Sequence, residues 1–377
     1  MIGIRADANS IIATGHMMRC MTIARALVMQ GQAVTFFVAD EESLKLFSSF
    51  AKDEFEIFSL ETDYRDMEGE LEILQGELKK RHIEALLVDS YSVTADYFKK
   101  LSSICRTAYL DDLKSDIYPV DILINYSGYA PEMGYEEAYS HVSGFEKEPT
   151  KLLLGLHYAP LRPQFYECEG DSLPEVAEDS QAADHAATPG RANNSGRINV
   201  LLSTGGADMC NMIVPVLENV IRSGLNADIT WHVVVGDYVS NTPEIEELAT
   251  SGDNIVLHRS VKNMAQLMRK CDIAVLAAGT MLTECAALRL PAVFYQVADN
   301  QKINVRYFGN TGGMIFAGSV MDGDDAKKHT IETIIREINR LSSDESTRNI
   351  MKEHLAGVTD GKGAIRISKA LAGRDLT

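Results

Sequence analysis

The chain has 377 residues, of which 45% are hydrophobic, and a formal net charge of −18. This length predicts two domains, because single hydrophobic cores stop growing beyond roughly 250–300 residues. The acidic balance argues against nucleic acid or an anionic membrane surface as the main partner, since both would repel the chain. A phosphorylated small molecule remains compatible with this charge, because backbone amides can bind phosphate locally.

Apolar runs and cysteines narrow the class further. No apolar run reaches membrane-spanning length, and the first residues lack the basic and then apolar pattern of a signal peptide. The six cysteines are scattered without the paired spacing of metal sites. We therefore expect a cytoplasmic monomer with reduced thiols, no metal, no cofactor and no stable membrane insertion.

The first part of the chain alternates strand-like and helix-like segments, which is typical of βαβ units and a parallel sheet. We expect a Rossmann-like N-terminal domain over residues 1–166. Its predicted strands are 2–5, 33–38, 54–58, 85–88, 107–110 and 122–124, and its predicted helices are 15–30, 66–80 and 94–104.

Residues 167–197 interrupt this alternation. They are rich in acidic and turn-forming residues and lack apolar periodicity, which predicts a flexible acidic linker or surface insertion and gives its His185 little functional weight. The alternation then resumes in a second Rossmann-like domain, 198–377, which we expect to bind a nucleotide. Its predicted strands are 198–203, 231–235, 255–257, 273–276 and 292–295, and its predicted helices are 209–223, 263–269, 281–288 and 331–341.

Two doubly wound α/β domains that face each other across a cleft resemble the GT-B architecture of nucleotide-sugar enzymes. That fold alone does not determine the chemistry.

His16 is the candidate general base. It follows the first predicted strand and a polar loop, and it stands at a helix start. Ligands bind where parallel strands end, and histidine readily takes a proton near neutral pH. Asp7 is the expected partner of its ring, although Asp7 can equally bond loop amides. A histidine at a helix start can also be structural, and His157 and His258 are competitors in less polar surroundings.

Polar residues follow other strands of the first domain. Tyr91 comes directly after one strand, and its hydroxyl either points into the cleft or belongs to the core. Asn125 follows a third strand, and we expect both side chains to contact substrate. The adjacent Asp111 and Asp112 could bind magnesium, but such pairs more often cap turns or helices.

Three loops of the second domain point to a diphosphate. The strand 273–276 ends in small residues, and a helix starts near Thr280, which can cap it; free amides and the helix dipole there attract anions. Glu284 lies one turn later, where a carboxylate can accept ribose hydroxyls or simply be solvated. The other two loops hold glycines that allow close backbone approach and amides that can bind oxygens. Their residues are Gly205, Gly206, Asn300 and Gln301.

Taken together, these residues resemble the UDP-2,4-diacetamido-2,4,6-trideoxy-β-L-altropyranose hydrolases of pseudaminic acid biosynthesis and the related spore-coat polysaccharide proteins. The resemblance covers nearly the whole chain apart from the region near 169–197. The matching pieces are Arg5-Ala6-Asp7, Gly15-His16-Met17-Met18-Arg19-Cys20, Asp89-Ser90-Tyr91, Leu110-Asp111-Asp112-Leu113, Leu154-Gly155 through Leu161-Arg162-Pro163, Gly205-Gly206-Ala207-Asp208, Ala278 to Glu284, Asn300-Gln301 and Asp360-Gly361-Lys362-Gly363-Ala364.

This resemblance implies release of UDP from a UDP-linked diacetamido-trideoxy hexose, by water attack at the anomeric carbon with inversion. His16 would be the base, Glu284 would hold the ribose, and the backbone near Val261 the uracil. Gly279 and Thr280 would hold the phosphates. The remaining substrate-binding residues that it implies are Arg5, Gly15 and Met281.

The sequence departs from the family in the phosphate region. Met281 and Leu282 stand where the family tends to have hydroxyls, Ala278 replaces an expected glycine, and Thr204 replaces an aromatic residue. These changes leave the sugar open. Two other functions also stay open: a GT-B glycosyltransferase, in which His16 deprotonates an acceptor alcohol, and a sugar-nucleotide-binding module without catalysis.

Overall fold

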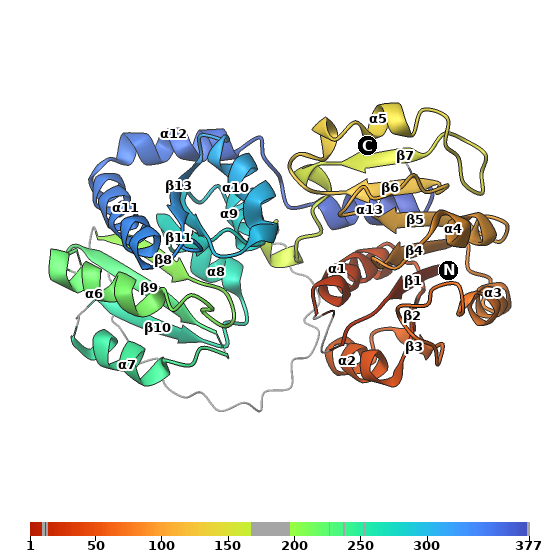
Figure 1. Cartoon of the computed structure of the whole chain (residues 1–377), viewed down its shortest axis with the longest axis horizontal. Helices are drawn as coiled ribbons and strands as arrows, with labels where there is room; N and C mark the ends of the chain where they lie inside the picture. Colours follow the sequence, from red (N-terminus) through yellow and green to blue (C-terminus); the bar gives the residue numbers. More distant parts are fainter. Residues whose placement is uncertain are drawn as a thin grey trace. The chain divides into compact units, whose positions relative to one another are not determined.

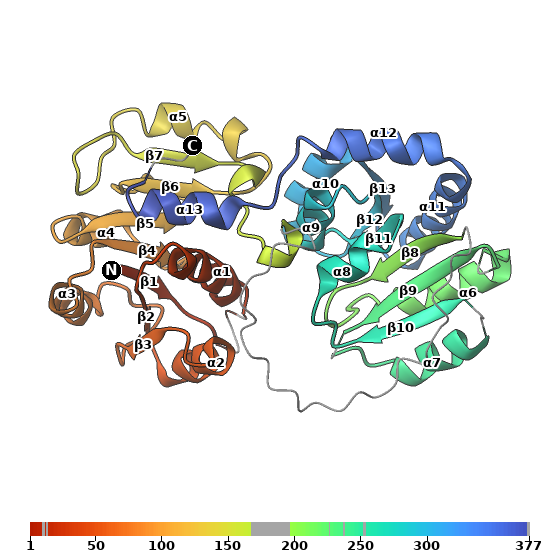
Figure 2. The same cartoon turned by 180° about the vertical axis from the view of Figure 1, so that it is seen from behind.

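The computed structural model describes residues 1–9, 12, 14–166, 197–225, 227–236, 238–251 and 254–374. The chain folds into two compact units, shown from opposite sides in Figures 1 and 2. Unit 1 consists of Met1–Arg162 together with Gly361–Thr377, and unit 2 consists of Pro163–Asp360.

Unit 1 is built on a seven-stranded sheet in the order β3-β2-β1-β4-β5-β6-β7, and each neighbouring pair is parallel. The six strands expected from the sequence are present, and a seventh, β7, adds an edge that alternation did not predict. The strands are β1 (Ile2–Ala6), β2 (Val34–Val38), β3 (Glu56–Ser59), β4 (Ala85–Asp89), β5 (Arg106–Leu110), β6 (Ile122–Asn125) and β7 (Lys151–Leu154).

Helices cover both faces of this sheet. Apolar residues of α1, α2 and α13 share one core cluster with β1, and those of α3, α4 and α5 share another. Helix α2 was not predicted from the sequence, although Asp40 caps it by accepting a hydrogen bond from the Ser43 N–H. The helices are α1 (Gly15–Met29), α2 (Glu41–Ala51), α3 (Leu71–Lys80), α4 (Ala95–Leu101), α5 (Tyr135–Ala138) and α13 (Gly363–Leu371), with short 3₁₀ turns η1 (Ala130–Glu132) and η2 (Leu156–Tyr158).

The last helix, α13, belongs to unit 1 although it follows unit 2 in the sequence. It packs against α1 and η2, as the blue helix beside α1 in Figure 2 shows. Ile367 and Leu371 are fully buried in the core that α1 lines. The sequence places residues up to 377 in the second domain, whereas the structure groups them with the first from Gly361 onward. The apolar face of α13 explains the difference, because burying it stabilises the first core.

Unit 2 has a six-stranded parallel sheet in the order β10-β9-β8-β11-β12-β13. The five expected strands are present, and β13 was not predicted. The strands are β8 (Ile198–Ser203), β9 (Ile229–Val235), β10 (Ile255–Arg259), β11 (Ile273–Ala277), β12 (Ala292–Gln296) and β13 (Met314–Ser319). The helices are α6 (Ile213–Ser223), α7 (Thr242–Ser251), α8 (Met264–Arg269), α9 (Met281–Ala287), α10 (Lys302–Gly309), α11 (Asp324–Ser343) and α12 (Glu345–Leu355), with 3₁₀ turns η3 (Pro163–Phe165) and η4 (Asp299–Gln301).

Each sheet has a point where the strand order reverses, between β1 and β4 in unit 1 and between β8 and β11 in unit 2. In doubly wound folds the carboxyl ends of strands at such points form the ligand crevice. The two candidate sites described below lie at these carboxyl edges.

Two further expectations concern regions outside the sheets. The expected linker, including His185, lies outside the described residues except for Arg197, which donates a hydrogen bond to Asn254. Within the described part of the chain, every helix is too short or too polar to cross a membrane.

Candidate functional site

His16 and Asp89 meet at the strand-order reversal of unit 1. His16 is the second residue of α1, and Asp89 is the last residue of β4. Strand β1 pairs with β4 up to Ala6 and Asp89, so the loop after β1 returns its helix beside the end of β4. The Nδ1 atom of His16 lies 2.5 Å from Oδ1 of Asp89. Both side chains are buried, with exposed fractions of 8% and 1%.

Asp89 accepts hydrogen bonds from three side chains on one face of α1. Arg19 donates from Nε to Oδ2 at 2.6 Å and from Nη2 to Oδ1 at 2.5 Å, and the Cys20 thiol lies 3.4 Å from Oδ2. Helical spacing places His16, Arg19 and Cys20 side by side. Burial would raise the pKa of Asp89, but the Arg19 charge and the hydrogen bonds from Arg19 and His16 hold it well below its usual range. Asp89 is therefore a carboxylate at neutral pH.

An ionised Asp89 assigns the protons of the His16 ring. A carboxylate only accepts hydrogen bonds, so Nδ1 of His16 carries a hydrogen, and in the neutral ring Nε2 carries the lone pair. Among the described residues, Nε2 has no hydrogen-bond partner. A buried carboxylate that fixes the tautomer of a histidine is the arrangement found in base-assisted hydrolysis.

Tyr91 and Asp112 complete the polar surroundings of His16. Arg19 donates from Nη1 to Asp112 at 2.8 Å and to the Tyr126 hydroxyl at 2.9 Å, and Tyr91 donates to Asp112 at 2.9 Å. The Tyr91 ring stands edge-on to His16, with ring centroids 4.7 Å apart. Burial and the Asp112 carboxylate raise the pKa of Tyr91 well above its usual value, so its hydroxyl stays protonated. Tyr91 is 56% exposed and can reach a ligand beside His16.

The structure corrects the expected roles of Asp7 and Arg5. Asp7 accepts hydrogen bonds from Arg5 at 2.6 Å and from the Ala39 N–H at 2.7 Å, so Asp89, not Asp7, orients His16. The alternative that Asp7 bonds loop amides is confirmed. Arg5 is fully buried and donates to Glu70 from Nε and Nη2, which makes it a structural residue instead of a substrate ligand.

Asn125 also differs from expectation. Its amide nitrogen donates to the Tyr135 hydroxyl at 3.0 Å, its oxygen accepts a backbone N–H two residues later, and the side chain is 1% exposed. It therefore holds the fold and does not face a ligand. Asp111 accepts the N–H of Lys114 at 2.8 Å and caps a turn. Across the described residues, no three His, Cys, Asp or Glu side chains gather in a way that could hold a metal ion.

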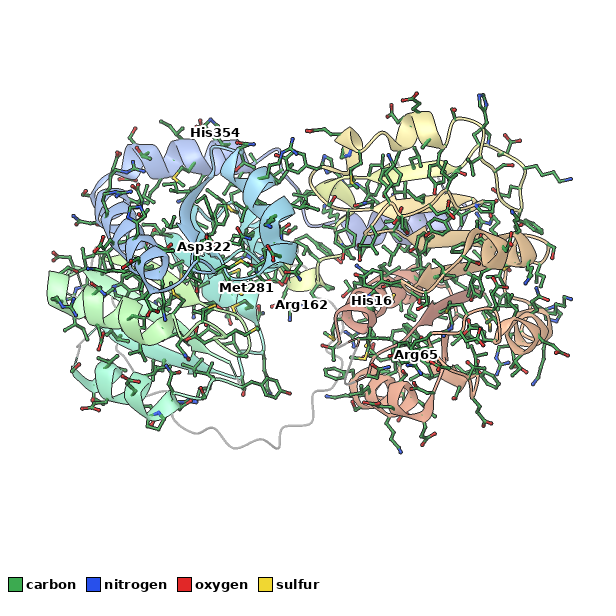
Figure 3. All side chains as sticks on the ribbon, viewed as in Figure 1. His16, Arg65, Arg162, Met281, Asp322 and His354 are labelled. Atoms are coloured by element: carbon green, nitrogen blue, oxygen red, sulfur yellow. The ribbon has the colours of Figure 1, made fainter. Side chains whose placement is uncertain are left out.

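The three expected loops of unit 2 lie at one carboxyl edge, because β8, β11 and β12 are parallel neighbours. Two contacts join the loop after β11 to its neighbours, one to the end of β8 and one to α10. Ser203, which ends β8, lies 3.4 Å from the Met281 sulfur at the start of α9, and Asn304 donates to the Ala278 carbonyl at 3.0 Å. Figure 3 labels Met281 in unit 2 and His16 in unit 1.

Gly205 and Gly206 shape the loop after β8. Gly205 has a φ of +89°, a conformation that side chains disfavour. The Gly206 carbonyl accepts the Tyr238 N–H at 3.1 Å and lies so close to Gly236 that a Cβ there would overlap it. A Cβ at Gly205, Gly206 or Gly279 would meet no atom within 4 Å, so the backbone at these positions is open to a ligand.

Other expected contacts of this edge are changed. Thr280 makes no side-chain cap, and α9 is only seven residues long. The side-chain oxygen of Gln301 accepts a hydrogen bond from the Val297 N–H at 2.9 Å. This oxygen therefore stabilises the turn between β12 and η4. Asn300 is exposed at the same turn.

The remaining expected residues lie at the ends of their elements. Gly15 is exposed as the first residue of α1, Glu284 is half-buried in the first turn of α9, and Val261 is half-buried just after β10.

Sequence reasoning assigned no role to Asp89, which it named only within a matching motif, and it noted Thr204 only as a departure from the family. Asp89 ended a predicted strand, and that position beside a polar loop was the available signal. Thr204 follows β8 with a buried hydroxyl that has no hydrogen-bond partner among the described residues. Of the competing histidines, His157 is exposed on η2 and His258 pairs with His232 at 3.0 Å.

Comparisons with known proteins agree with this architecture. No family model matches the chain. It is 23% identical over 300 residues to an uncharacterized protein of Methanocaldococcus jannaschii, a match that covers 78% of this chain and 54% of that protein, or about half its length. It is 21% identical over 372 residues to the spore coat polysaccharide biosynthesis protein SpsG of Bacillus subtilis, covering 98% and 97% of the two chains.

Solved structures show the same fold. MurG of Acinetobacter baumannii superposes with a TM-score of 0.63 at 11% identity over 99% of both chains. The UDP-GlcNAc 2-epimerase of Neisseria meningitidis, determined with UDP-GlcNAc bound, superposes with a TM-score of 0.60 at 12% identity, covering 99% of this chain and 100% of that one. The protein therefore has the fold expected from its sequence, with two Rossmann-like domains of the GT-B type.

Proposed function

We propose that the protein is a nucleotide-sugar hydrolase, which uses water to release UDP from a UDP-linked sugar. In this proposal the carboxyl edge of unit 2 binds the nucleoside diphosphate, and His16 of unit 1 activates the water. The observation that carries the proposal is the contact between His16 Nδ1 and the ionised Asp89, which leaves Nε2 as a proton acceptor.

The proposed reaction needs one base and no metal. Nε2 of His16 takes a proton from water while the water oxygen bonds to the anomeric carbon. The bond between that carbon and the β-phosphate oxygen breaks, and UDP leaves with the electron pair. Backbone amides that bind the diphosphate stabilise the developing charge, so UDP leaves without a strong acid. Attack opposite the leaving group inverts the anomeric configuration.

Sequence likeness supports a narrower substrate. The chain is similar along its whole length to a protein of spore coat polysaccharide biosynthesis, and its motifs resemble those of hydrolases that act on UDP-diacetamido-trideoxy hexoses. We propose that such a sugar is the substrate and that the product enters a nonulosonic acid or a surface polysaccharide. Thr204 and Met281, which depart from the family pattern, lie at the edge where this choice would be made.

The proposal is tested by incubating the purified protein with a panel of UDP-sugars in the absence of an acceptor and following UDP by ³¹P NMR. We expect release of UDP and free sugar from a diacetamido sugar. The His16→Ala variant should lose about 10²–10⁴-fold in rate, which is the usual contribution of a general base. His157→Ala is the matched control, because His157 is exposed on η2.

Other results would contradict the proposal in distinguishable ways. Turnover that appears only after an alcohol acceptor is added would identify a glycosyltransferase, the function carried by some proteins of this fold. Tight UDP-sugar binding without turnover under either condition would identify a binding module. Release that persists in His16→Ala would exclude His16 as the base.

A further inference from the structure

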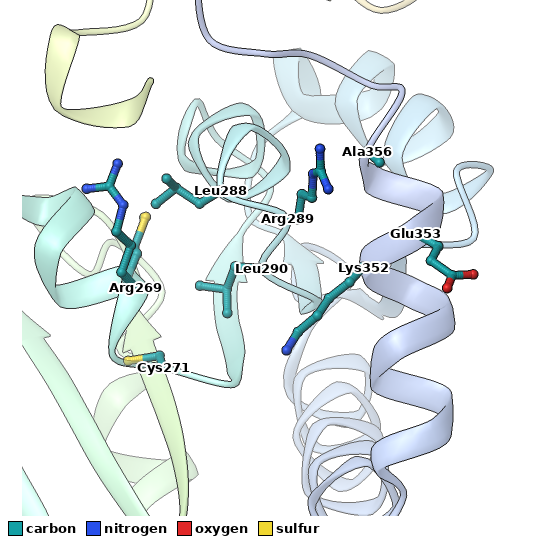
Figure 4. Close-up of a pocket in the computed structure, with 9 residues that line it drawn as sticks. Arg269, Cys271, Leu288, Arg289, Leu290, Lys352, Glu353 and Ala356 are labelled. Carbon is teal, nitrogen blue, oxygen red and sulfur yellow. The ribbon is translucent and has the colours of Figure 1, made fainter. Parts of the chain in front are cut away.

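A cavity of about 550 Å³ lies at the amino edge of the unit 2 sheet, where Leu290 precedes β12. Figure 4 shows that the charged ends of Arg269, Arg289 and Lys352 point to different sides. The one carboxylate among the residues that line this cavity, on Glu353, points away from Leu290. The polar groups here therefore do not converge on one ligand, whereas the loop after β5 in unit 1 brings an acceptor and apolar groups together.

The loop after β5 carries the most exposed large apolar side chain in the described part of unit 1. Leu113 is 58% exposed, and Tyr91, which follows the neighbouring strand β4, comes next with 56%. Single exposed apolar residues are common on protein surfaces. These two, however, adjoin the same carboxylate, because Tyr91 donates a hydrogen bond to Asp112 and Leu113 follows Asp112 in the chain. Their exposure therefore coincides with the candidate site.

Buried hydrogen bonds fix the backbone of this loop. Asp111 is fully buried, and its Oδ1 accepts the N–H of Leu113 at 3.1 Å and the N–H of Lys114 at 2.8 Å. Its Oδ2 accepts the Tyr135 hydroxyl at 2.8 Å. The Lys114 ammonium in turn donates to the Met133 carbonyl. The turn therefore holds Leu113 at the surface, where contact with an apolar group of a ligand would remove it from water.

One carboxylate oxygen of Asp112 is available to a ligand. Its Oδ2 accepts hydrogen bonds from Arg19 Nη1 at 2.8 Å and from the Tyr91 hydroxyl at 2.9 Å. Among the residues that the structure describes, none donates to its Oδ1, and the side chain is 27% exposed. Arg19 also donates to Asp89, the carboxylate that orients His16. A single guanidinium group therefore joins Asp112 to the partner of the proposed base.

We propose that Asp112 and Leu113 recognise an acetamido group on the carbon next to the anomeric carbon of the sugar. Such a group combines an N–H donor with a methyl group. Asp112 Oδ1 accepts the N–H, and Leu113 and Tyr91 contact the methyl group. A hydroxyl at the same place would supply a donor but leave Leu113 in water. This inference rests on the proposed function, in which His16 faces the anomeric carbon.

The test compares the methylene phosphonate analogues of UDP-GlcNAc and UDP-glucose, in which CH₂ replaces the anomeric oxygen. The two probes differ only in the acetamido group and cannot be cleaved at that bond, so calorimetric titration of the full chain measures affinity alone. We expect the UDP-GlcNAc analogue to bind about tenfold more tightly. Asp112→Ala and Leu113→Ala should each lower this ratio to about threefold or less. A change that merely loosens the site lowers both affinities and leaves their ratio.

Asp116→Ala and Ile117→Ala are the matched controls, an exposed carboxylate and an exposed apolar side chain of the same loop, and should keep the ratio. Thermal unfolding of each variant confirms that it folds. The proposal is overturned if the wild type binds both analogues equally, or if either Asp112→Ala or Leu113→Ala keeps the ratio. Equal binding of the analogues overturns the acetamido contact alone, whereas failure of UDP and both analogues to bind overturns the proposed function as well.

Discussion

At the scale of residues, the proposed function depends on the hydrogen bonds that side chains of α1 donate to one carboxylate, Asp89. Asp89 is ionised because Arg19 and His16 donate to it, and His16 is oriented because Asp89 accepts. The sequence predicted His16 and Tyr91 as site residues from their places after strands. It did not identify Asp89 as the partner, because Asp7 is nearer in sequence and the order in which β4 joins β1 is not visible in alternation. Arg5 and Asn125 are as polar in the sequence as His16 and Tyr91 are. In the structure both are buried, and their side chains bond to other residues of the fold.

The Asp89→Asn variant keeps His16 but changes the group that orients its ring, so it tests whether turnover depends on that orientation. The amide can donate to Nδ1 as well as accept, so the tautomer of His16 is no longer fixed. The half-buried Arg19 keeps only the more exposed Asp112 carboxylate as its counter-charge. We expect turnover to fall about 100-fold or more and the free energy of unfolding to fall by about 3 kcal/mol. UDP release and urea denaturation measure the two effects. Asp96→Asn on α4, an exposed carboxylate, should change neither, and wild-type turnover in Asp89→Asn would contradict the assigned role.

At the scale of elements, most strands were predictable and several helices were not. Buried parallel strands such as β4 and β11 are short continuous apolar runs that stand out between turns. Helices α7 and α12 carry few apolar residues, and edge strands β7 and β13 are partly exposed, so their patterns are weak. The membership of α13 in unit 1 depends on a contact between distant segments, which no local pattern contains.

Gly363→Ala tests the packing of α13. A Cβ at this position would overlap the carbonyl oxygen of Ala159, so the helix must shift away from its seat. We expect a loss of about 1–3 kcal/mol in the free energy of unfolding, measured by urea denaturation. Gly357→Ala, where an added Cβ meets nothing within 4 Å, should be neutral by comparison. Equal stability of the two variants would mean that α13 does not pack as described.

Acid should weaken unit 2 through strands β9 and β10. Burial, His258 and Lys270 lower the pKa of His232 to about 4, from an ordinary value of about 6.5. Above pH ~6.5 the histidine is neutral in both states, so its contribution to stability is fully present. As the pH falls from ~6.5 toward 4, the unfolded chain takes up a proton that the folded chain refuses, and the free energy of unfolding decreases.

The measurement is the free energy of unfolding against pH for wild type and two variants. His232→Gln should give a shallower decline between pH ~6.5 and ~4, whereas His329→Gln on α11, an exposed histidine, should follow the wild type. A decline as steep in His232→Gln as in the wild type would contradict a half-buried His232 that stays neutral in the folded state.

At the scale of the whole molecule, the two units have separate tasks in the proposed reaction. Unit 1 would supply the base through His16, and unit 2 would bind the nucleotide along loops that include Gly279. His16→Ala should therefore keep the stabilisation by UDP, seen as a rise in melting temperature, while losing turnover. Gly279→Val should fold, because a Cβ there meets nothing within 4 Å, but lose that stabilisation because the side chain blocks the backbone. The opposite pattern would reverse the assignment.

The central claim is that water attacks the anomeric carbon of the UDP-sugar and not the β-phosphorus. Hydrolysis of the UDP-sugar in H₂¹⁸O, followed by mass spectrometry of the UDP, tests it most directly. We expect UDP without ¹⁸O and a free sugar that carries the label, because the bond between the anomeric carbon and its oxygen breaks. UDP labelled on its β-phosphate would show attack at phosphorus and would contradict the proposed reaction.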